Sequence, residues 1–155
     1  MKKLTIIAAI ATAFLISTNV KAQGVQEVVD PIDLYIHEVA TEFQLSESLL
    51  ASLIYEESRF KVVDNLTQIT NVKWFEEGCE YCGSSDISNP YVNIRICGYY
   101  LHKWAEENPG EVYLWLRAWN EGEENAKENP YYVSGYAKRI TQRQEMWVEQ
   151  GIYND

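Results

Sequence analysis

Apolar residues recur along this chain at spacings of three and four positions, the period of an α-helix with one buried face. Asn, Asp or Ser before such a stretch, in places followed by Pro, is typical of a helix start. Five helices are predicted: Asp30-Pro31 to Phe43, about 47–58 with Ser46 as N-cap, Asn89-Pro90 to Ala105, Glu111–Trp119, and Asn129-Pro130 to about Trp147. Residues 61–88 lack a clear helical period, so we expect short strands or loops there. The pattern predicts a mainly α globule with some β structure (α+β).

One carboxylate falls where this pattern requires an apolar residue. One face of the second helix carries, at positions i, i+3, i+4 and i+7, the residues Leu50, Leu53, Ile54 and Glu57. Loss of solvent and the negative end of the helix dipole would both raise the pKa of Glu57. A Glu that stays protonated near neutral pH is suited to act as a general acid. The structural alternative is a partly exposed, ion-paired residue at a helix end, beside Arg59.

Length and composition indicate one globular domain. The chain has 155 residues, of which 46% are hydrophobic and 13% aromatic, which is typical of a chain with a single core. The formal net charge of -10 argues against binding to nucleic acid, which requires a basic face.

Residues 1–22 have the features of a signal peptide. Lys2-Lys3 is followed by the apolar run Leu4–Ile16, and Val20-Lys21-Ala22 places small residues before a cleavage site. The apolar run is short for a membrane span, and an uncleaved anchor is the alternative. We therefore expect an exported protein, periplasmic or extracellular, whose mature domain covers residues 23–155.

The three cysteines, Cys79, Cys82 and Cys97, offer either a disulfide or a metal site. An exported chain permits a disulfide, and we favour a bridge from Cys97 to Cys79 or Cys82, with a Cys79–Cys82 bridge as the alternative. Adding His102 gives a set with the ligand types of a zinc site. However, Cys97 and His102 are five positions apart on one predicted helix, where their side chains diverge by about 140°. We therefore expect no metal and no cofactor.

Glu57 belongs to an ordered series of short motifs. They are Tyr55–Phe60 (YEESRF), Asn65–Thr70 (NLTQIT), Asn89–Arg95 with Gly98–Leu101, Ala118–Gly122 (AWNEG) and, more weakly, Tyr136–Ile140 (YAKRI). In this order they resemble the EESRF, GLMQ or GLTQIT, DPxxNIxxGxxYL, AYNAG and YVKRV segments of the lytic transglycosylases, a goose-lysozyme-like family that cleaves peptidoglycan. The resemblance covers about residues 33–141. Each motif alone has low specificity, whereas four in register are highly specific.

The resemblance implies a lysozyme-like fold with a substrate cleft and one catalytic carboxylate. Glu57 would protonate the β-1,4 glycosidic oxygen between MurNAc and GlcNAc, and would then accept the proton of the C6 hydroxyl as 1,6-anhydroMurNAc forms. Other positions carry implied roles: a sugar contact or loop support for Ser58, hydrogen bonds to the N-acetyl and sugar groups for Gln68 and Asn120, and orientation of Glu57 for Tyr136. The ordinary alternatives are a helix cap for Ser58 and a helix stop for Asn120.

Three positions depart from the family motifs. Asn65 replaces a Gly, and Asn is the residue that best tolerates positive φ in its place. Trp119, which we also assign to substrate binding, replaces a Tyr and removes a hydroxyl that would hold the substrate or Glu57. Glu121 replaces an Ala and adds a negative charge near the cleft.

Two other functions stay open on the sequence alone. A hydrolytic muramidase would need a second carboxylate, for which Asp64, Glu76, Glu77 and Asp86 are candidates by position. A weakly active wall-binding assembly protein with the same fold is motivated by the net charge and by Trp119. The expected partner is the peptidoglycan glycan strand, acted on by a monomer; the sequence does not choose between wall turnover, a secretion or conjugation machine, and a phage.

Overall fold

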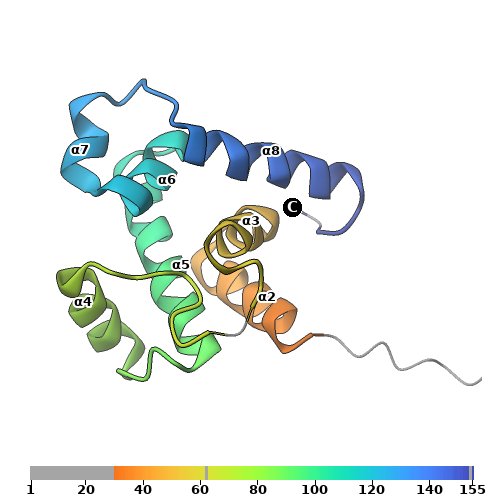
Figure 1. Cartoon of the computed structure of the whole chain (residues 1–155), viewed down its shortest axis with the longest axis vertical. Coiled ribbons are helices and arrows are strands. Elements are labelled where there is room, and N and C mark those ends of the chain that lie inside the picture. Colours follow the sequence, from red (N-terminus) through yellow and green to blue (C-terminus); the bar gives the residue numbers. More distant parts are fainter. Residues whose placement is uncertain (1–29, 62, 154) are drawn as a thin grey trace, which may run out of the picture.

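The computed structural model describes residues 30–61, 63–153 and 155, and its regular elements are helices joined by loops (Figure 1). The helices are α2 (Pro31–Phe43), α3 (Glu47–Ser58), α4 (Val72–Cys82), α5 (Pro90–Glu107), α6 (Val112–Glu121), α7 (Glu123–Glu128) and α8 (Gly135–Glu149). No strand occurs within the described ranges. The prediction of a mainly α fold is therefore confirmed, and the prediction of β structure within residues 61–88 is wrong.

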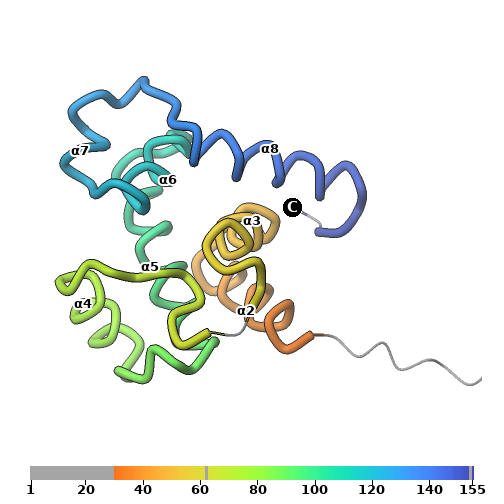
Figure 2. Tube along the Cα trace, viewed as in Figure 1, coloured from red at the N-terminus to blue at the C-terminus, as the bar shows by residue number. Residues whose placement is uncertain are grey.

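Helix α5 runs through the middle of the molecule, and the other helices pack around it (Figures 1 and 2). Helix α2 lies along α5, α4 packs on α5 from another side, and α3 lies between α2 and α8. The core between them contains fully buried apolar side chains, among them Ile36, Leu50, Leu53, Ile94, Leu101 and Leu116. The C-terminal end of α3, which carries Glu57, is thereby held against α8.

The starts of three helices agree with the sequence. The side chains of Asp30, Ser46 and Asn89 each accept a hydrogen bond from a backbone N–H in the first turn of α2, α3 and α5. These bonds satisfy N–H groups that have no partner inside a helix. The predictions for these three helices are confirmed.

Helix α4 occupies a stretch in which we expected strands or loops. The Asn71 side chain accepts a hydrogen bond of 3.2 Å from the first turn, and Gly83 ends the helix with a left-handed φ of 69°. Gly78 is the one fully buried residue of this helix, and a Cβ there would lie 2.5 Å from Ile96 of α5. Trp74, Phe75, Cys79 and Cys82 recur at helical spacing and pack, partly buried, against the core, so an apolar period is present, and Asn71 and Gly83 mark the two ends of the helix.

Helix α8 begins after Ser134, later than the start predicted at Asn129-Pro130. The Ser134 hydroxyl accepts a hydrogen bond of 3.1 Å from the first turn of α8. The carbonyls of Asn129 and Tyr132 instead accept hydrogen bonds from the Arg117 side chain. Carbonyls turned toward Arg117 are not available to a helix, so this segment forms a link between α7 and α8.

Gly98 allows close contact between α5 and α2, which gives a first prediction. A Cβ on Gly98 would lie 2.5 Å from Val39 Cγ1 and 2.9 Å from Phe43 Cδ2, and both side chains are buried. We expect Gly98→Ala to lower the free energy of unfolding by about 1–3 kcal/mol in urea titrations, since the helices must separate. Gly135→Ala is the control, because its Cβ would meet its nearest atom at an ordinary 3.6 Å. A Gly98→Ala protein as stable as wild type would contradict this packing.

The predicted signal peptide, residues 1–22, lies outside the described residues, as do residues 23–29 of the predicted mature domain. Within the part described, no helix combines the length and the apolar character needed to cross a bilayer. All the helices above therefore belong to the predicted domain of residues 23–155.

Candidate active site

Glu57 lies in the last turn of α3, at the edge of the core. The helix ends at Arg59, whose φ of 59° is left-handed and whose backbone N–H donates to the Tyr55 carbonyl at 2.9 Å. Leu53 and Ile54, earlier on the same face, are fully buried, whereas Glu57 is half-buried. The carboxylate is thus partly removed from water and still open to a ligand.

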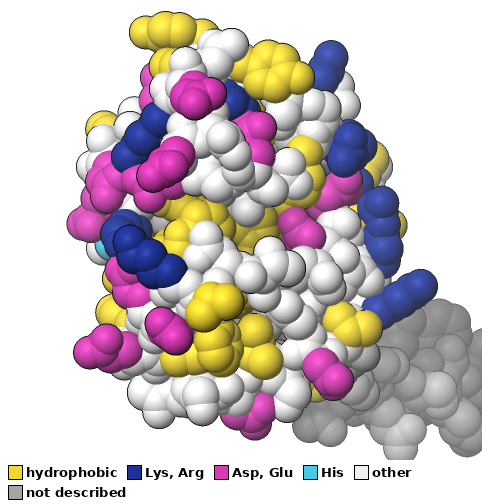
Figure 3. All heavy atoms as spheres, turned by 60° about the vertical axis from the view of Figure 1, so that its left-hand side comes forward, with side chains coloured by type: hydrophobic (Ala, Val, Ile, Leu, Met, Phe, Trp, Pro, Cys, Tyr) yellow, Lys and Arg dark blue, Asp and Glu magenta, His cyan; other side chains and the backbone are white. Residues whose placement is uncertain are grey.

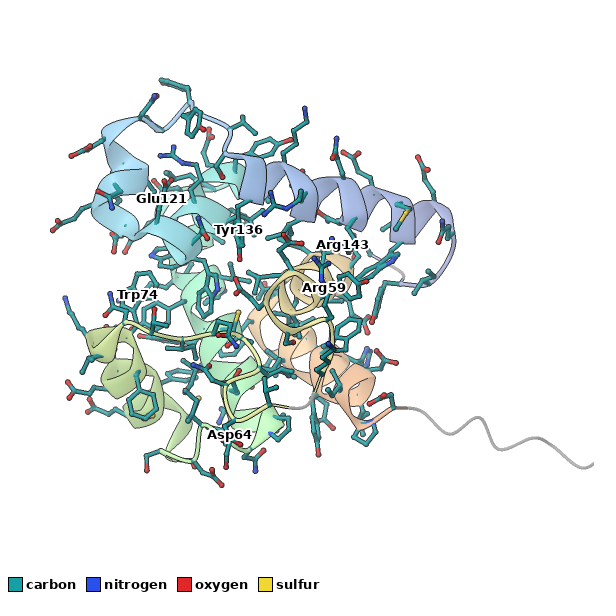
Figure 4. All side chains as sticks on the ribbon, viewed as in Figure 1. Arg59, Asp64, Trp74, Glu121, Tyr136 and Arg143 are labelled. Atoms are coloured by element: carbon teal, nitrogen blue, oxygen red, sulfur yellow. The ribbon has the colours of Figure 1, made fainter. Side chains whose placement is uncertain are left out.

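Two side chains from other helices hold the Glu57 carboxylate. The Tyr136 hydroxyl, in the first turn of α8, donates to Oε1, and the indole of Trp119 on α6 lies close enough to lower the pKa of Glu57 as well. Figure 4 shows Tyr136 between α6 and α8. Burial, followed by the charge of Glu57, raises the pKa of Tyr136 far above its usual range, so the phenol stays a donor. Trp119, which stands where the family motif has a tyrosine, therefore lies beside the Glu57 carboxylate.

The pKa of Glu57 is raised above its ordinary value. Burial is the largest cause, and the negative charge of Glu56 acts in the same direction. The hydrogen bonds from Tyr136 and Trp119 act against this rise but do not cancel it. A carboxyl in this state keeps its proton to a higher pH than a free Glu and can donate it to a bound ligand.

Glu56, the neighbouring carboxylate, is held in the ionised form. Arg139 Nε donates to Glu56 Oε1 at 2.6 Å, and Arg143 Nη2 donates to Oε2 at 3.0 Å. Burial acts to raise the pKa of Glu56, but the hydrogen bonds and charges of the two arginines outweigh it, so the pKa is lowered. Two adjacent carboxyls whose pKa values move apart are typical of acid–base sites. These arginines were not among the predicted site residues, although their i, i+4 spacing places them on one face of a helix.

A hollow lined by Trp74 and by polar residues lies at the start of α4, beside the Trp74 ring that stacks on Trp119. Trp119 stacks on Trp74, with ring centroids 6.1 Å apart and 26° between the planes, and Trp74 borders a hollow of about 290 Å³. Its other lining residues come from the start of α4 and the junction of α6 with α7: Asn71, Lys73, Gly122, Glu123, Glu124 and Asn125. Figure 3 shows hydrophobic side chains in a depression across the middle of one face, with acidic side chains beside it. Aromatic faces next to amide and charged groups suit a sugar ligand.

Gln68 is exposed on the loop before α4, and its side chain is bonded within that loop. Its Nε2 donates to the Asn65 carbonyl at 2.8 Å, and its φ of 56° is left-handed. We expected Asn65 to take the positive φ of the glycine it replaces, but Gln68 has it. Asn65 instead uses its amide, which donates to the Ile69 carbonyl at 2.8 Å and accepts from the Asn93 amide at 3.1 Å. These bonds fix the loop to α5, while the Gln68 side chain stays at the surface.

Ser58 and Asn120 lie at the ends of the two helices that meet at the site. The Ser58 hydroxyl donates to the Ile54 carbonyl at 3.0 Å, which is a bond within α3. Asn120 is exposed in the last turn of α6, next to Trp119. Of the predicted site residues, the structure thus brings Trp119 and Tyr136 to Glu57, and it leaves Ser58 bonded to its own helix.

The three cysteines are free thiols, so the disulfide that we predicted is not formed. Ile96 is the residue of α5 that meets α4, whereas the next residue, Cys97, is fully buried on the side of Glu57. Burial and then the charge of Glu57 raise the pKa of Cys97 well above its usual range. Cys97 therefore faces away from Cys79 and Cys82 on α4. Nowhere in residues 30–61, 63–153 and 155 do three His, Cys, Asp or Glu side chains gather as metal ligands.

Two of the four candidates for a second carboxylate, Glu77 and Asp86, are bonded to other residues. Glu77 accepts a hydrogen bond of 2.6 Å from Lys103, the main cause that lowers the pKa of Glu77, and two tyrosine hydroxyls also donate to it. Asp86 accepts a hydrogen bond of 2.6 Å from a nearby serine. Figure 4 shows Asp64 at the lower edge of the molecule, away from Tyr136. Glu77 and Asp86 are therefore engaged by other groups, and the fourth candidate, Glu76, is exposed on α4.

Comparison with known proteins finds no match. No protein-family model, no curated protein and no solved structure matches this chain. The function must therefore be argued from the sequence motifs and from the geometry around Glu57.

Proposed function

We propose that this protein is a peptidoglycan lytic transglycosylase with a lysozyme-like fold, and that the hollow beside Trp74 is part of its substrate cleft. The observation that carries the proposal is the state of Glu57: a half-buried carboxyl with a raised pKa, bonded by Tyr136. Trp119, beside it, stacks on Trp74, which borders the hollow. The ordered motifs around these residues support the same function.

Glu57 acts twice in the proposed reaction. It first gives its proton to the β-1,4 glycosidic oxygen as the bond to C1 of MurNAc breaks, and the electron pair leaves with the GlcNAc hydroxyl. The N-acetyl group of the substrate stabilises the positive charge at C1. Ionised Glu57 then takes the proton of the C6 hydroxyl, whose oxygen bonds to C1 and closes the 1,6-anhydro ring. No water is consumed, and Glu57 ends the cycle protonated.

A reaction with one carboxylate fits the surroundings of Glu57 better than a hydrolytic one. A retaining hydrolase needs a second carboxyl about 5–5.5 Å from the first, and an inverting one needs it about 6.5–9.5 Å away. Glu56 is the adjacent carboxylate, but Arg139 and Arg143 bond both of its oxygens. A carboxylate held in this way is a poor nucleophile or base.

Mass spectrometry of the products tests the proposal directly. Residues 23–155 would be incubated with purified peptidoglycan, and the released muropeptides would be weighed. Products one water lighter than reducing-end muropeptides are expected. Hydrated, reducing-end products would instead indicate a muramidase, and an intact protein that releases nothing would indicate a weakly active wall-binding protein.

Tyr136→Phe gives a second prediction, on pH dependence. Glu57 must be protonated to act as the acid, so the rate falls as the pH rises through the raised pKa of Glu57. The Tyr136 hydrogen bond lowers the pKa of Glu57, so its loss is expected to move the alkaline limb of kcat/KM to higher pH. We also expect kcat to fall roughly tenfold, because a bond to a charged group is lost. Tyr131→Phe, on a fully exposed ring, is the control, and an unmoved alkaline limb in Tyr136→Phe would contradict this role of Tyr136.

The proposed substrate also sets the location of the protein. Peptidoglycan lies outside the cytoplasmic membrane, which agrees with the signal-peptide features of residues 1–22. We therefore place a monomeric enzyme in the periplasm or outside the cell, acting on glycan strands either in wall turnover or at a secretion, conjugation or phage assembly.

A further inference from the structure

Three arginines from α3 and α8 gather around Glu56, directly beside Glu57 in the chain. Arg139 and Arg143 bond the Glu56 carboxylate, and Arg59 Nη1 lies 3.7 Å from its Oε2. Figure 4 shows Arg59 and Arg143 together where the end of α3 meets α8. Three positive charges against one negative charge leave a net charge of +2 at this corner, in a chain whose net charge is -10.

Arg143 is fully used by the fold. Its side chain is only 15% exposed, and it donates to the Ser52 carbonyl at 3.3 Å as well as to Glu56. Its guanidinium also lies 4.5 Å from the centre of the Tyr55 ring. These contacts close α3 against α8 and leave Arg143 little capacity for a ligand.

Arg59 and Arg139 present hydrogen-bond donors to solvent. Their side chains are 51% and 57% exposed. Arg139 uses Nε for Glu56, and its two terminal nitrogens have no acceptor among the residues that the structure describes. The Arg59 guanidinium lies over the Tyr55 ring, 4.7 Å from its centre, a contact that limits its movement while half of the side chain stays exposed.

Two guanidinium groups fixed in this way form a binding site for a planar anion. Arginine forks bind carboxylates and phosphates through paired hydrogen bonds that are stronger than neutral ones. In peptidoglycan, the carboxylates nearest to the cleaved bond belong to the peptide stem that MurNAc carries. Phosphate polymers attached to the wall are another source of anions on the same strands.

We propose that Arg59 and Arg139 bind a carboxylate of the peptide stem on the MurNAc that lies at Glu57. This inference rests on the proposed function and adds a specificity site to it. The site gives an acidic protein a local attraction for an anionic substrate. It also makes the enzyme distinguish stems with free carboxylates from stems in which they are amidated.

The test measures binding without catalysis, with Glu57→Gln protein and soluble glycan strands that carry their stems. One sample of strands is native, a second has its carboxylates converted to amides with carbodiimide and ammonia, and a third has its wall phosphates removed with hydrofluoric acid. We expect amidation to raise Kd roughly tenfold, because about one charge-assisted hydrogen bond is lost. Removal of the phosphates should leave Kd unchanged. When Arg59→Gln and Arg139→Gln are added to the Glu57→Gln protein, its Kd for native strands should rise to the value that the Glu57→Gln protein has for amidated strands.

A matched control removes two positive charges elsewhere. Arg95→Gln with Lys103→Gln breaks ion pairs to Glu42 and Glu77, which do not line the hollow, and should bind like the parent protein. If Arg59→Gln with Arg139→Gln lowers Tm, the variant with Arg59→Lys and Arg139→Lys replaces it, because lysine keeps the positive charge but lacks the paired donors of the guanidinium. The Kd of this variant for native strands should also rise.

Equal Kd values for native and amidated strands would overturn the inference. So would an equal rise in Kd when the two control charges, rather than the two arginines, are removed. Weaker binding after phosphate removal alone would assign the site to phosphate instead. The products of the wild-type enzyme separate the two levels of the proposal. Anhydro products without an effect of amidation overturn only the stem site, whereas neither products nor binding would overturn both.

Discussion

Replacement of Glu57 by Gln is expected to lower kcat by at least about 10³-fold while the protein stays folded. Gln has nearly the shape of Glu and keeps an oxygen for the donors Tyr136 and Trp119, but it cannot give or take a proton. One side chain serves as both acid and base in the proposed reaction, so no second group can replace it. The measurement is the initial rate of anhydro-muropeptide release from purified peptidoglycan.

The stability of the same variant tests the electrostatics of the site independently of catalysis. The pKa of Glu57 is raised in the folded protein, so folding disfavours its ionised form. Stability is therefore lost as the pH rises from the ordinary value of a Glu through the raised pKa. Gln has no such loss. At neutral pH, Glu57→Gln should be at least as stable as wild type in urea.

Glu56→Gln is the matched control, one residue away on the same helix. It weakens the ion pairs to Arg139 and Arg143 and should cost stability, yet it leaves the proposed acid in place and should retain most of the rate. A Glu57→Gln enzyme with the wild-type rate would contradict the catalytic assignment. That result would favour a second acid, or a wall-binding function that needs no chemistry.

Replacement of Arg117 by Met is expected to lower the free energy of unfolding by about 3–5 kcal/mol. Arg117 is only 3% exposed, and its guanidinium donates to the Glu121 carboxylate and to the carbonyls of Asn129, Asn125 (3.2 Å) and Tyr132 (3.3 Å). Met fills the space but leaves one carboxylate and three carbonyls without this donor. Urea titration of both proteins measures the difference.

Lys127→Met is the control for this change, because it also removes a cation four residues from its Glu partner. That pair is exposed, so its loss should cost less than about 1 kcal/mol. An equally small loss for Arg117→Met would contradict a structural role for this arginine. The same contacts correct the expectation for Glu121, whose charge is paired with Arg117 rather than left free near the cleft.

Helix starts could be predicted wherever a capping side chain precedes an apolar period. Asp30, Ser46 and Asn89 met both conditions, and α2, α3 and α5 begin there. Helix α4 has both the cap, Asn71, and an apolar face, Trp74, Phe75, Cys79 and Cys82, but that face is short and only partly buried, so the sequence prediction missed it. The start of α8 was placed too early because long-range hydrogen bonds from Arg117 hold the preceding segment out of a helix.

The candidate site could be predicted only where it depends on a local sequence pattern. Glu57 is visible in the sequence because it interrupts a local apolar face. The contacts of Tyr136 and Trp119 with Glu57 join segments far apart in the chain, and only the motif resemblance pointed to Tyr136. No sequence rule indicated that Trp119 would supply a donor, or that Cys97 would turn toward Glu57 and away from the other thiols.

The two donors on Glu57 belong to different helices, Trp119 to α6 and Tyr136 to α8. The proton affinity of Glu57 therefore depends on the spacing between these helices. By thermodynamic linkage, protonation of Glu57 and the placement of α6 relative to α8 influence each other equally. A glycan strand that draws the helices together strengthens both hydrogen bonds and favours release of the proton. In the proposed reaction, a strand that separates them would make Glu57 retain its proton, so the seating of the strand would set when the proton is delivered.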